Sequence, residues 1–263
     1  MKQKDFKYIY GPVSSWRLGR SLGVDPIGTS GKICSFNCIY CQIGKTTKLS
    51  NKREVFVDTK KLIKEISLVP HKGIDYITFS GMGEPTLAKN LKTLIKKIQK
   101  IRKEKIAVIT NSTLISKKSV RDDLLSADFV IAKLDAPNES IYSKINRPFG
   151  LIKLDGIVKG LKDFRKVFKK RLAIQIMFTV VNKDFAYELA SLVNSINPDE
   201  VQINTPLRPS KTKPLSRPQI ERISKVFVKI CKDIRVVSVY KSAKKKVISI
   251  SQPDTIRRRG KPF

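Results

Sequence analysis

The chain alternates short apolar runs with segments whose apolar residues recur at helical spacing, and this alternation constrains the fold more than any other feature. Short apolar runs are typical of buried strands, and recurrence at positions i, i+3, i+4 and i+7 is typical of amphipathic helices. Strands are predicted over Ile74–Phe79, Ile106–Thr110, Phe129–Leu134, Leu172–Val181 and Val201–Asn204. Helices are predicted over Thr59–Leu68, Leu87–Ile101, Lys118–Leu125, Leu154–Phe164, Phe185–Val193 and Ile220–Ile230.

Repeated strand–helix units predict an α/β fold with a parallel sheet. With a first strand placed just before Cys34, the units number six, which suits a partial (β/α)6 barrel of the TIM-like kind rather than a closed eightfold barrel. Residues 1–215 are assigned to this core, and residues 216–263 to a short basic C-terminal extension packed on it. The extension is predicted to hold a helix, a hairpin built from residues 234–240 and 247–250, and a basic tail.

Polar residues follow the predicted strands, where barrel-like α/β folds form their active sites. A cysteine-containing loop follows the first strand, and a glycine-rich turn at residues 80–86 follows the second. The later strands end in further polar candidates, which are Asn111, Lys133, Asp135, Thr179 and Asn182. Position alone makes them candidates for ligand binding, and each is equally compatible with capping a strand end or forming a salt bridge.

Three of the four cysteines lie within eight residues, at the spacing Cys34-x3-Cys38-x2-Cys41. Thiolates at this spacing converge on one metal centre, and a centre with three protein ligands keeps one coordination position open for chemistry. The alternative is a structural zinc site, but such a site commonly takes four ligands. The remaining candidates, His71 and Cys231, are far away in sequence, and Cys231 is expected to be a core thiol on a helix.

The cysteine loop and the turn Gly81-Met82-Gly83-Glu84-Pro85 together resemble the radical S-adenosylmethionine (radical SAM) superfamily. The resemblance implies that Cys34, Cys38 and Cys41 bind a [4Fe-4S] cluster whose fourth iron is chelated by the amino and carboxylate groups of SAM. It also implies reductive cleavage of SAM to methionine and a 5′-deoxyadenosyl radical, which abstracts a hydrogen atom from a substrate.

The resemblance also suggests which residues contact SAM. Gly81 and Gly83 let the backbone approach a ligand closely, and their polar groups together with Glu84 are expected to meet the SAM ammonium. Tyr40, just before the last cysteine, is expected to pack on the adenine. The five strand-end candidates Asn111, Lys133, Asp135, Thr179 and Asn182 are expected to reach the ribose or the carboxylate.

A narrower similarity points to a branch related to the wyosine-type tRNA synthases. Residues 10–25 look like the opening of that branch, and Asn146-Arg147-Pro148 and residues 204–209 are similar to it as well. Those synthases carry a second iron–sulfur cluster on additional cysteines. Because only Cys231 is left over in this chain, a second three-cysteine cluster is excluded, and a related but different chemistry is expected.

The net charge of +32 predicts a polyanionic partner, most simply RNA, although composition alone does not choose between RNA, DNA and other anions. The similarity to the wyosine-type tRNA synthases makes tRNA the first choice of substrate. Residues 211–263 contain 16 basic and 3 acidic residues, with dense runs at 244–246 and 257–261. A solvated, self-repelling tail is the alternative interpretation. A peptide or small-metabolite substrate, or an RNA-binding module with a structural metal, also remains open. We further expect an external electron donor such as flavodoxin or ferredoxin, a cytoplasmic location and no membrane span.

Overall fold

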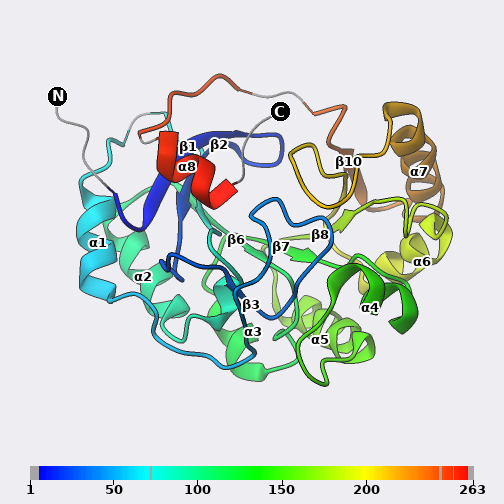
Figure 1. The fold of residues 1–263 in the computed structure, drawn as a ribbon, viewed down its shortest axis with the longest axis horizontal. Helices are drawn as coiled ribbons and strands as arrows, with labels where there is room; N and C mark the ends of the chain where they lie inside the picture. Colours follow the sequence, from blue (N-terminus) through cyan, green and yellow to red (C-terminus); the bar gives the residue numbers. More distant parts are fainter. Residues whose placement is uncertain (1–5, 72, 243–244, 251, 260–263) are drawn as a thin grey trace.

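The computed structural model describes residues 6–71, 73–242, 245–250 and 252–259, in which one curved eight-stranded sheet forms the centre of the protein (Figure 1). Its strands are, in chain order, β1 (Ile9–Ser15), β2 (Gly19–Val24), β5 (Tyr76–Phe79), β6 (Lys105–Thr110), β7 (Phe129–Lys133), β8 (Arg171–Met177), β9 (Glu200–Asn204) and β10 (Arg235–Ser238). This chain order is also the spatial order. The edge strand β1 is antiparallel to β2, and all later neighbours pair in parallel.

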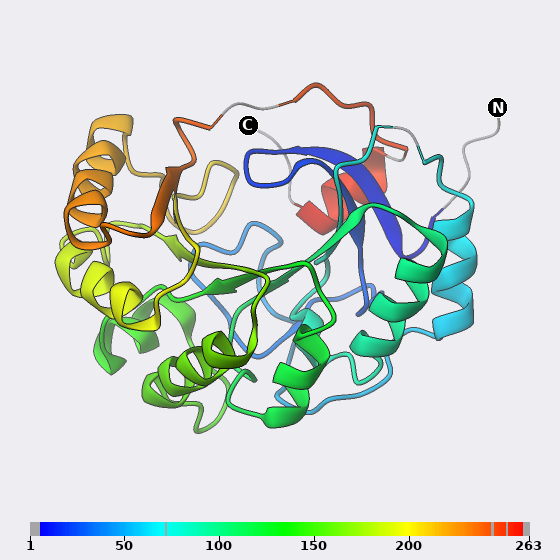
Figure 2. The ribbon, with the colours of Figure 1, turned by 180° about the vertical axis from the view of Figure 1, so that it is seen from behind.

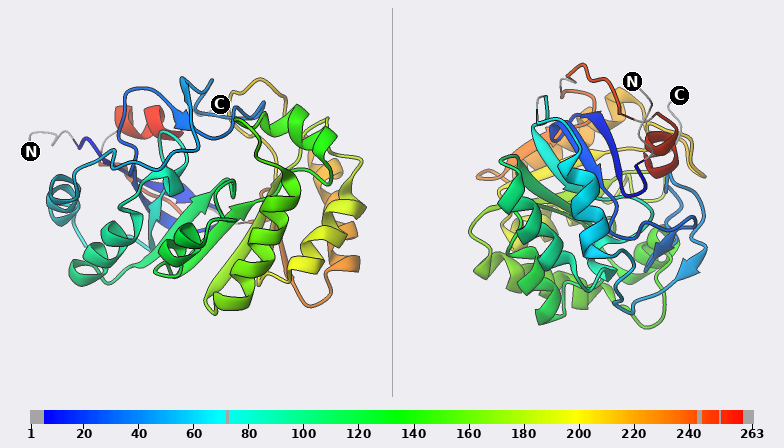
Figure 3. Two further views of the ribbon diagram at one scale, coloured as in Figure 1. Left: turned by 90° about the horizontal axis from the view of Figure 1, so that it is seen from below. Right: turned by 90° about the vertical axis from the view of Figure 1, so that its left-hand side faces the viewer.

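Helices cover the convex outer face of this sheet, as Figures 2 and 3 show. They are α1 (Thr59–Ser67), α2 (Leu91–Ile101), α3 (Lys118–Leu124), α5 (Leu154–Val167), α6 (Ala186–Ile196) and α7 (Arg217–Ile230). The helix α4 (Glu139–Asn146) lies instead beside the segment 37–39, to which the carbonyls of its last residues are hydrogen-bonded. A last helix, α8 (Gln252–Arg259), lies on the opposite side, over the edge of the sheet. None of the helices in the described ranges is long and apolar enough to cross a membrane.

The apolar residues of the strands pack in two directions. A large cluster joins the helices to the convex face of the sheet, as expected when amphipathic helices cover parallel strands. A small separate cluster of Leu18, Ala107, Phe129, Ile131 and Ala173 fills only part of the concave face. The remainder of that face is therefore left for the polar side chains at the strand ends.

The structure confirms the predicted partial barrel of alternating strands and helices. The first parallel strand, however, is β2 and not the segment just before Cys34, which forms the two-residue strand β3 (Ile33–Cys34) paired with β4 (Lys48–Leu49). Strand β2 was not predicted because glycine, arginine and serine residues interrupt the apolar run by which a buried strand is recognised. Strand β8 ends at Met177, four residues before the predicted end, and the short helix α4 was not predicted.

The predicted C-terminal hairpin is wrong. Residues 235–238 form β10, which pairs in parallel with β9, and residues 247–250 form no strand. The chain instead runs back across the molecule, and α8 packs against β1 (Figure 1). Ile250 N donates to the carbonyl of Gly11 in β1 over 2.6 Å, near the end of this return. Lys244 and Lys261, parts of the predicted basic runs, lie outside the described residues.

A buried ion pair anchors α8. Arg258 Nε lies 3.0 Å from Asp25 Oδ2, and both side chains are fully buried. Asp25 follows β2 and also accepts the amides of Ile27 and Gly28, while Arg258 donates to the carbonyl of Lys7. Burial raises the pKa of Asp25, and the guanidinium of Arg258 opposes that rise. The charge of Asp25 therefore depends on Arg258 for compensation, and Arg258 also pairs with Asp254 at 3.1 Å.

Removing one partner of this pair should destabilise the protein strongly. In Arg258→Ala the carboxylate of Asp25 stays buried without its guanidinium, and breaking such a pair costs about 3–5 kcal/mol of unfolding free energy. Arg257→Ala is the matched control, because Arg257 is exposed and pairs only loosely, at 3.5 Å, with Asp254. Urea unfolding followed by circular dichroism measures both variants. Equal stability of the two would contradict a structural role for the pair.

Candidate active site

The three clustered cysteines line one cavity of about 570 Å³ on the concave side of the sheet. Cys34 ends β3, and Cys38 and Cys41 follow in the loop that lies over the carboxyl ends of the parallel strands. The glycine-rich turn after β5 and the strand ends of β6 and β7 line the same cavity. The structure thus brings together the cysteine loop and the turn that the sequence placed on separate strands.

Each cysteine sulfur receives a polar donor from a different residue. Asn111 Nδ2 lies 3.5 Å from Cys34 Sγ, Asn146 Nδ2 lies 3.5 Å from Cys38 Sγ, and Lys32 Nζ lies 3.0 Å from Cys41 Sγ. Burial raises the pKa of the Cys34 thiol to about 12 and that of the Cys38 thiol to about 11. A positively charged centre that binds the thiolates would offset this cost.

The described side chains do not form a site for a single metal ion. Among the described residues, no three His, Cys, Asp or Glu side chains lie close enough together to hold one metal ion. An iron–sulfur cluster binds each cysteine to a different iron atom, so its thiolates stand further apart. The fourth cysteine, Cys231, is buried at the end of α7 against the carbonyl of Ala190 and does not line this cavity. The donor set therefore consists of three thiolates.

Glycine is required where the turn after β5 meets the cysteine loop. Gly83 has φ +152°, and a Cβ at this position would lie 1.6 Å from the carbonyl oxygen of Ile33. Gly81 has φ +143°, and its Cβ would lie 2.5 Å from the carboxyl carbon of Asp25. Both conformations strain residues other than glycine. The turn thus packs directly beneath the residue that precedes the first cysteine.

The buried carboxylate of Glu84 organises the strand ends on either side of the turn. It accepts hydrogen bonds from the amide and hydroxyl of Thr86, the hydroxyl of Thr110 at 2.7 Å and the amide of Asn111 at 2.7 Å. Burial raises the pKa of Glu84, and these donors counteract that rise. Asn111 is held further by its bond to Ser35 Oγ at 2.9 Å. Both Glu84 and Asn111 line the cavity.

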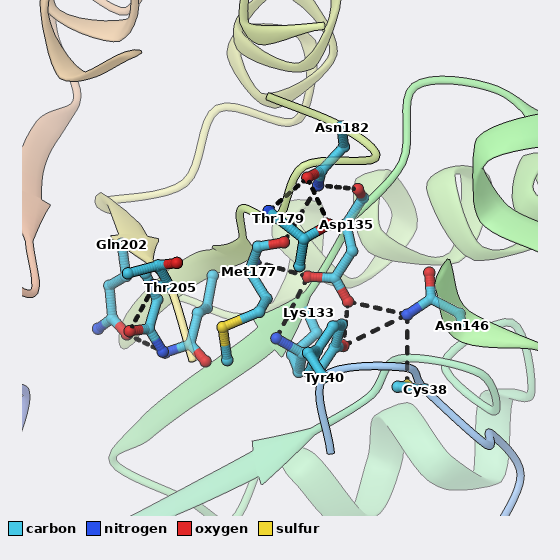
Figure 4. Close-up of polar contacts among 12 residues, drawn as sticks. Cys38, Tyr40, Lys133, Asp135, Asn146, Met177, Thr179, Asn182, Gln202 and Thr205 are labelled. Carbon is cyan, nitrogen blue, oxygen red and sulfur yellow. Dashed lines mark hydrogen bonds and ion pairs between the residues drawn. The ribbon is translucent and has the colours of Figure 1, made fainter. Parts of the chain in front are cut away.

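Tyr40, Lys133 and Asp135 form one connected group (Figure 4). The hydroxyl of Tyr40 donates to Asp135, Lys133 Nζ lies 3.2 Å from Asp135 Oδ1, and the same ammonium lies 4.8 Å from the centre of the Tyr40 ring. Asn146 donates to Asp135 Oδ2 over 2.9 Å. Tyr40 and Lys133 line the cavity, while Asp135 lies behind them and accepts the amide of Met177.

Thr179 and Asn182 do not line the cavity. Both are fully buried, and the carboxamide oxygen of Asn182 accepts the amide of Thr179 over 2.7 Å. Asn182 Nδ2 donates to the carbonyl of Asp135 over 2.8 Å and to that of Met177 over 3.1 Å. These contacts cap the ends of β7 and β8 (Figure 4). Thr179 and Asn182 lie beyond β8 because this strand ends at Met177, before the predicted position. For either side chain to touch a ligand in the cavity, these caps would have to rearrange.

Sequence reasoning missed two residues that contact the cysteine loop. Lys32 is buried between Cys41 and the carbonyl of Gly44, and its place two residues before the first cysteine was the available signal. Asn146 ends α4 and reaches Cys38, Tyr40 and Asp135. Its sequence signal was only the resemblance of the segment Asn146-Arg147-Pro148, because α4 itself was not predicted.

A family model described as the radical SAM superfamily matches residues 29–193, more than half of the chain. The protein therefore belongs to the radical SAM superfamily and is an enzyme of that class. The superfamily uses a [4Fe-4S] cluster and S-adenosylmethionine, so the cofactors predicted from the cysteine loop are those of the family to which the chain belongs.

Several proteins are similar to this chain. It is 42% identical to the UPF0026 protein slr1464 of Synechocystis, over 81% of this chain and 79% of that protein. It is 37% identical to the UPF0026 protein MJ1312 of Methanocaldococcus jannaschii, over 83% of this chain and 69% of that protein. A probable GTP 3′,8-cyclase of Sulfurisphaera tokodaii is 26% identical over 69% of this chain and 53% of that protein.

Two solved structures share the fold. Streptococcus suis SuiB bound to S-adenosylmethionine superposes with a TM-score of 0.62 at 17% identity, over 80% of this chain and 48% of that chain. TYW1 with a lysine–pyruvate adduct bound superposes with a TM-score of 0.60 at 20% identity, over 80% of this chain and 73% of that chain. At these identities the similarity establishes the architecture, and the chemistry rests on the site.

The contact between the glycine turn and the cysteine loop gives a direct test. In Gly83→Ala the new Cβ would collide with the carbonyl of Ile33, so the cysteine loop must shift and cluster assembly should fail. Gly156→Ala, in α5, is the control, because no atom outside its own helix lies within 4 Å of the added Cβ and alanine favours a helix by about 1 kcal/mol. Iron and sulfide content after anaerobic reconstitution measures both. Wild-type iron content in Gly83→Ala would refute the steric argument.

Proposed function

We propose that the protein cleaves S-adenosylmethionine reductively at a single [4Fe-4S] cluster held by Cys34, Cys38 and Cys41. The observation that carries this proposal is the convergence of the three cysteines and the glycine turn on one cavity. With its bound cofactors, such a site supplies an electron that breaks a carbon–sulfur bond of SAM and yields a 5′-deoxyadenosyl radical. The count of four cysteines, one of them in the core beside α6, supports a single cluster.

The residues of the chain hold and shield the ligands rather than supply the radical chemistry. Gly81 and Gly83 open space for SAM beside Glu84, and Tyr40, Asn111 and Lys133 form further parts of the cavity wall. We propose that these six contact SAM, and that Asp135, Thr179 and Asn182 support that wall from behind. The buried Asp135 group fixes the orientation of Tyr40 and Lys133 before any ligand arrives. Such preorganisation places a reacting carbon–hydrogen bond near the radical and keeps water out.

SAM cleavage tests this proposal. The reconstituted protein, reduced with dithionite in the presence of SAM, should release 5′-deoxyadenosine, which chromatography measures. Cys38→Ala should lose both the iron and this product, because a thiolate ligand is missing. Cys231→Ala is the matched control and should keep both, since Cys231 lies in the core away from the cavity. If wild type and Cys38→Ala behave alike, the enzyme proposal fails.

We also propose that the substrate is an RNA, specifically a tRNA, and that a flavodoxin or ferredoxin in the cytoplasm delivers the electron. The support is electrostatic: the net charge is +32, and exposed lysines stand beside the cysteine loop. Lys211, in the loop after β9, lines a hollow together with Cys38 and Cys41, and Lys213 follows it. A basic surface next to the active-site opening suits a polyanion whose modified group enters the cavity.

RNA binding should weaken steeply as salt is added. Replacing Lys211 and Lys213 by glutamine should lower the slope of log affinity against log salt by about one for each phosphate that no longer has a lysine partner. Lys96→Gln with Lys97→Gln, on the outer face of α2, removes the same charge away from the cavity. Filter binding of unmodified tRNA measures both double variants. Identical slopes for the two pairs would contradict an RNA surface beside the cysteine loop.

A further inference from the structure

The cavity wall carries a large excess of positive charge. Among the described residues that line it, six are basic (Arg17, Lys32, Lys133, Arg208, Arg258 and Arg259), and the one acidic residue is Glu84. Glu84 is already engaged by three donor residues of the neighbouring loops. Its charge is therefore committed to holding the turn, and it does not neutralise the basic side chains.

Three of the six basic side chains have anionic partners of their own. Arg258 pairs with Asp25 at 3.0 Å, and Lys133 pairs with Asp135 at 3.2 Å. Lys32 faces the sulfur of Cys41 at 3.0 Å, where a bound thiolate would balance its charge. The charges of these three side chains are therefore balanced by partners within the fold or in the cysteine loop.

The other three are Arg17, Arg208 and Arg259, which we call the arginine triad. No carboxylate of the described residues lies within ion-pair distance, 4.0 Å, of any of them. Arg208 Nη1 donates to Gln42 Oε1 over 3.3 Å, and Arg259 Nη2 donates to the carbonyl of Ser14 over 2.8 Å. These partners are neutral, so they leave the charges uncompensated.

The triad lines one part of the cavity wall, and each of its side chains is only partly exposed to solvent. Burial, together with the nearby guanidinium of Arg208, lowers the pKa of Arg17 to about 10. Burial likewise lowers the pKa of Arg259 to about 9, with Arg208 and Arg17 as further causes. All three stay charged at neutral pH. Arg17 Nε is buried without a hydrogen-bond partner, and its guanidinium lies 5.1 Å from the ring of Trp16.

We propose that the arginine triad binds a phosphate group of the substrate, in the cavity that also receives SAM. The three guanidinium groups come from the turn between β1 and β2, the loop after β9 and α8, so the fold gathers them from distant parts of the chain. Arg208 is bonded to Gln42, the residue after Cys41, which places this phosphate site beside the cysteine loop. The inference rests on the proposed function for the identity of the cavity as the reaction chamber.

Phosphate suits the triad better than a carboxylate does. Three like charges in a low-dielectric cavity repel one another, and a carboxylate of charge −1 would neutralise only one of them. A phosphate group carries up to two negative charges and several acceptor oxygens, so that planar guanidinium groups can bind it in pairs of hydrogen bonds. The same chemistry is offered by a phosphorylated small molecule and by the backbone or terminal phosphate of an RNA.

Phosphate binding can be measured without turnover. We expect the reconstituted full-length protein to bind inorganic phosphate one-to-one by calorimetry, at a salt concentration that screens the surface lysines. The fluorescence of Trp16, the single tryptophan of the chain, should change in parallel because Trp16 lies beside Arg17. Arg17→Gln, Arg208→Gln and Arg259→Gln should each weaken binding about tenfold or more, as expected when a charge-assisted hydrogen bond is removed.

Arg222→Gln is the matched control, because Arg222 is exposed on α7 and does not line the cavity. Phosphate binding that is absent in wild type, or equal in all four variants, overturns the inference. Displacement of phosphate by SAM, one for one, also overturns it, since the triad would then serve the methionine carboxylate. These measurements need neither a reductant nor turnover. They can therefore be interpreted even if the protein does not cleave SAM.

A last comparison identifies the source of the phosphate. Adenosine monophosphate and a short RNA oligonucleotide are titrated into wild type and into Arg208→Gln. If the substitution weakens both ligands, the cavity admits RNA phosphates. If it weakens only the nucleotide, the substrate phosphate belongs to a small molecule, and the RNA part of the proposed function fails while the phosphate site stands. If it weakens neither, the triad does not bind phosphate.

Discussion

The contact of Gly83 with the backbone of Ile33 fixes the position of the active site. Two hydrogen bonds join these segments, from Ile33 N to the carbonyl of Met82 at 3.0 Å and from Glu84 N to the carbonyl of Ile33 at 3.2 Å. Because the backbones are this close, no Cβ fits at residue 83. Cys34 is the next residue along the chain, so the sheet positions the start of the loop that carries the proposed cluster ligands, although this loop contains little regular structure.

Asp135 plays the corresponding role on the other side of the cavity. Its carboxylate is almost fully buried and takes the Tyr40 hydroxyl, the Lys133 ammonium, the Asn146 amide and the Met177 amide as partners. A buried carboxylate costs several kcal/mol unless it is paired and hydrogen-bonded, and these contacts compensate it. They also tie β7, β8 and α4 to the cysteine loop (Figure 4). Asp135 thereby orients residues that line the cavity, without lining it itself.

The sequence predicted the strands β5 to β9, most of the helices and the cysteine loop because these depend on local patterns. Apolar spacing marks β5 to β9 and their helices, and Cys34, Cys38 and Cys41 are close together in sequence. The role of Asn182 was harder to predict, since a strand-end asparagine can face a ligand or cap its own strand. The strand β2 and the return of the chain to β1 depend on pairing between distant segments, which no local pattern reports. The arginine triad was missed for the same reason.

The position of α8 also changes the meaning of the net charge. From the sequence alone, the three arginines at 257–259 belong to one basic run, and nothing distinguishes one from another. In the structure Arg257 is exposed, Arg258 is buried on Asp25, and Arg259 faces the cavity beside Arg17. Salt screens an exposed charge over about 8–10 Å, whereas a buried guanidinium keeps most of its field. The ion pair of Arg258 holds α8 in place and thereby brings the charge of Arg259 into the cavity. Of the basic run, Arg258 thus anchors the helix and Arg259 adds a charge to the cavity wall.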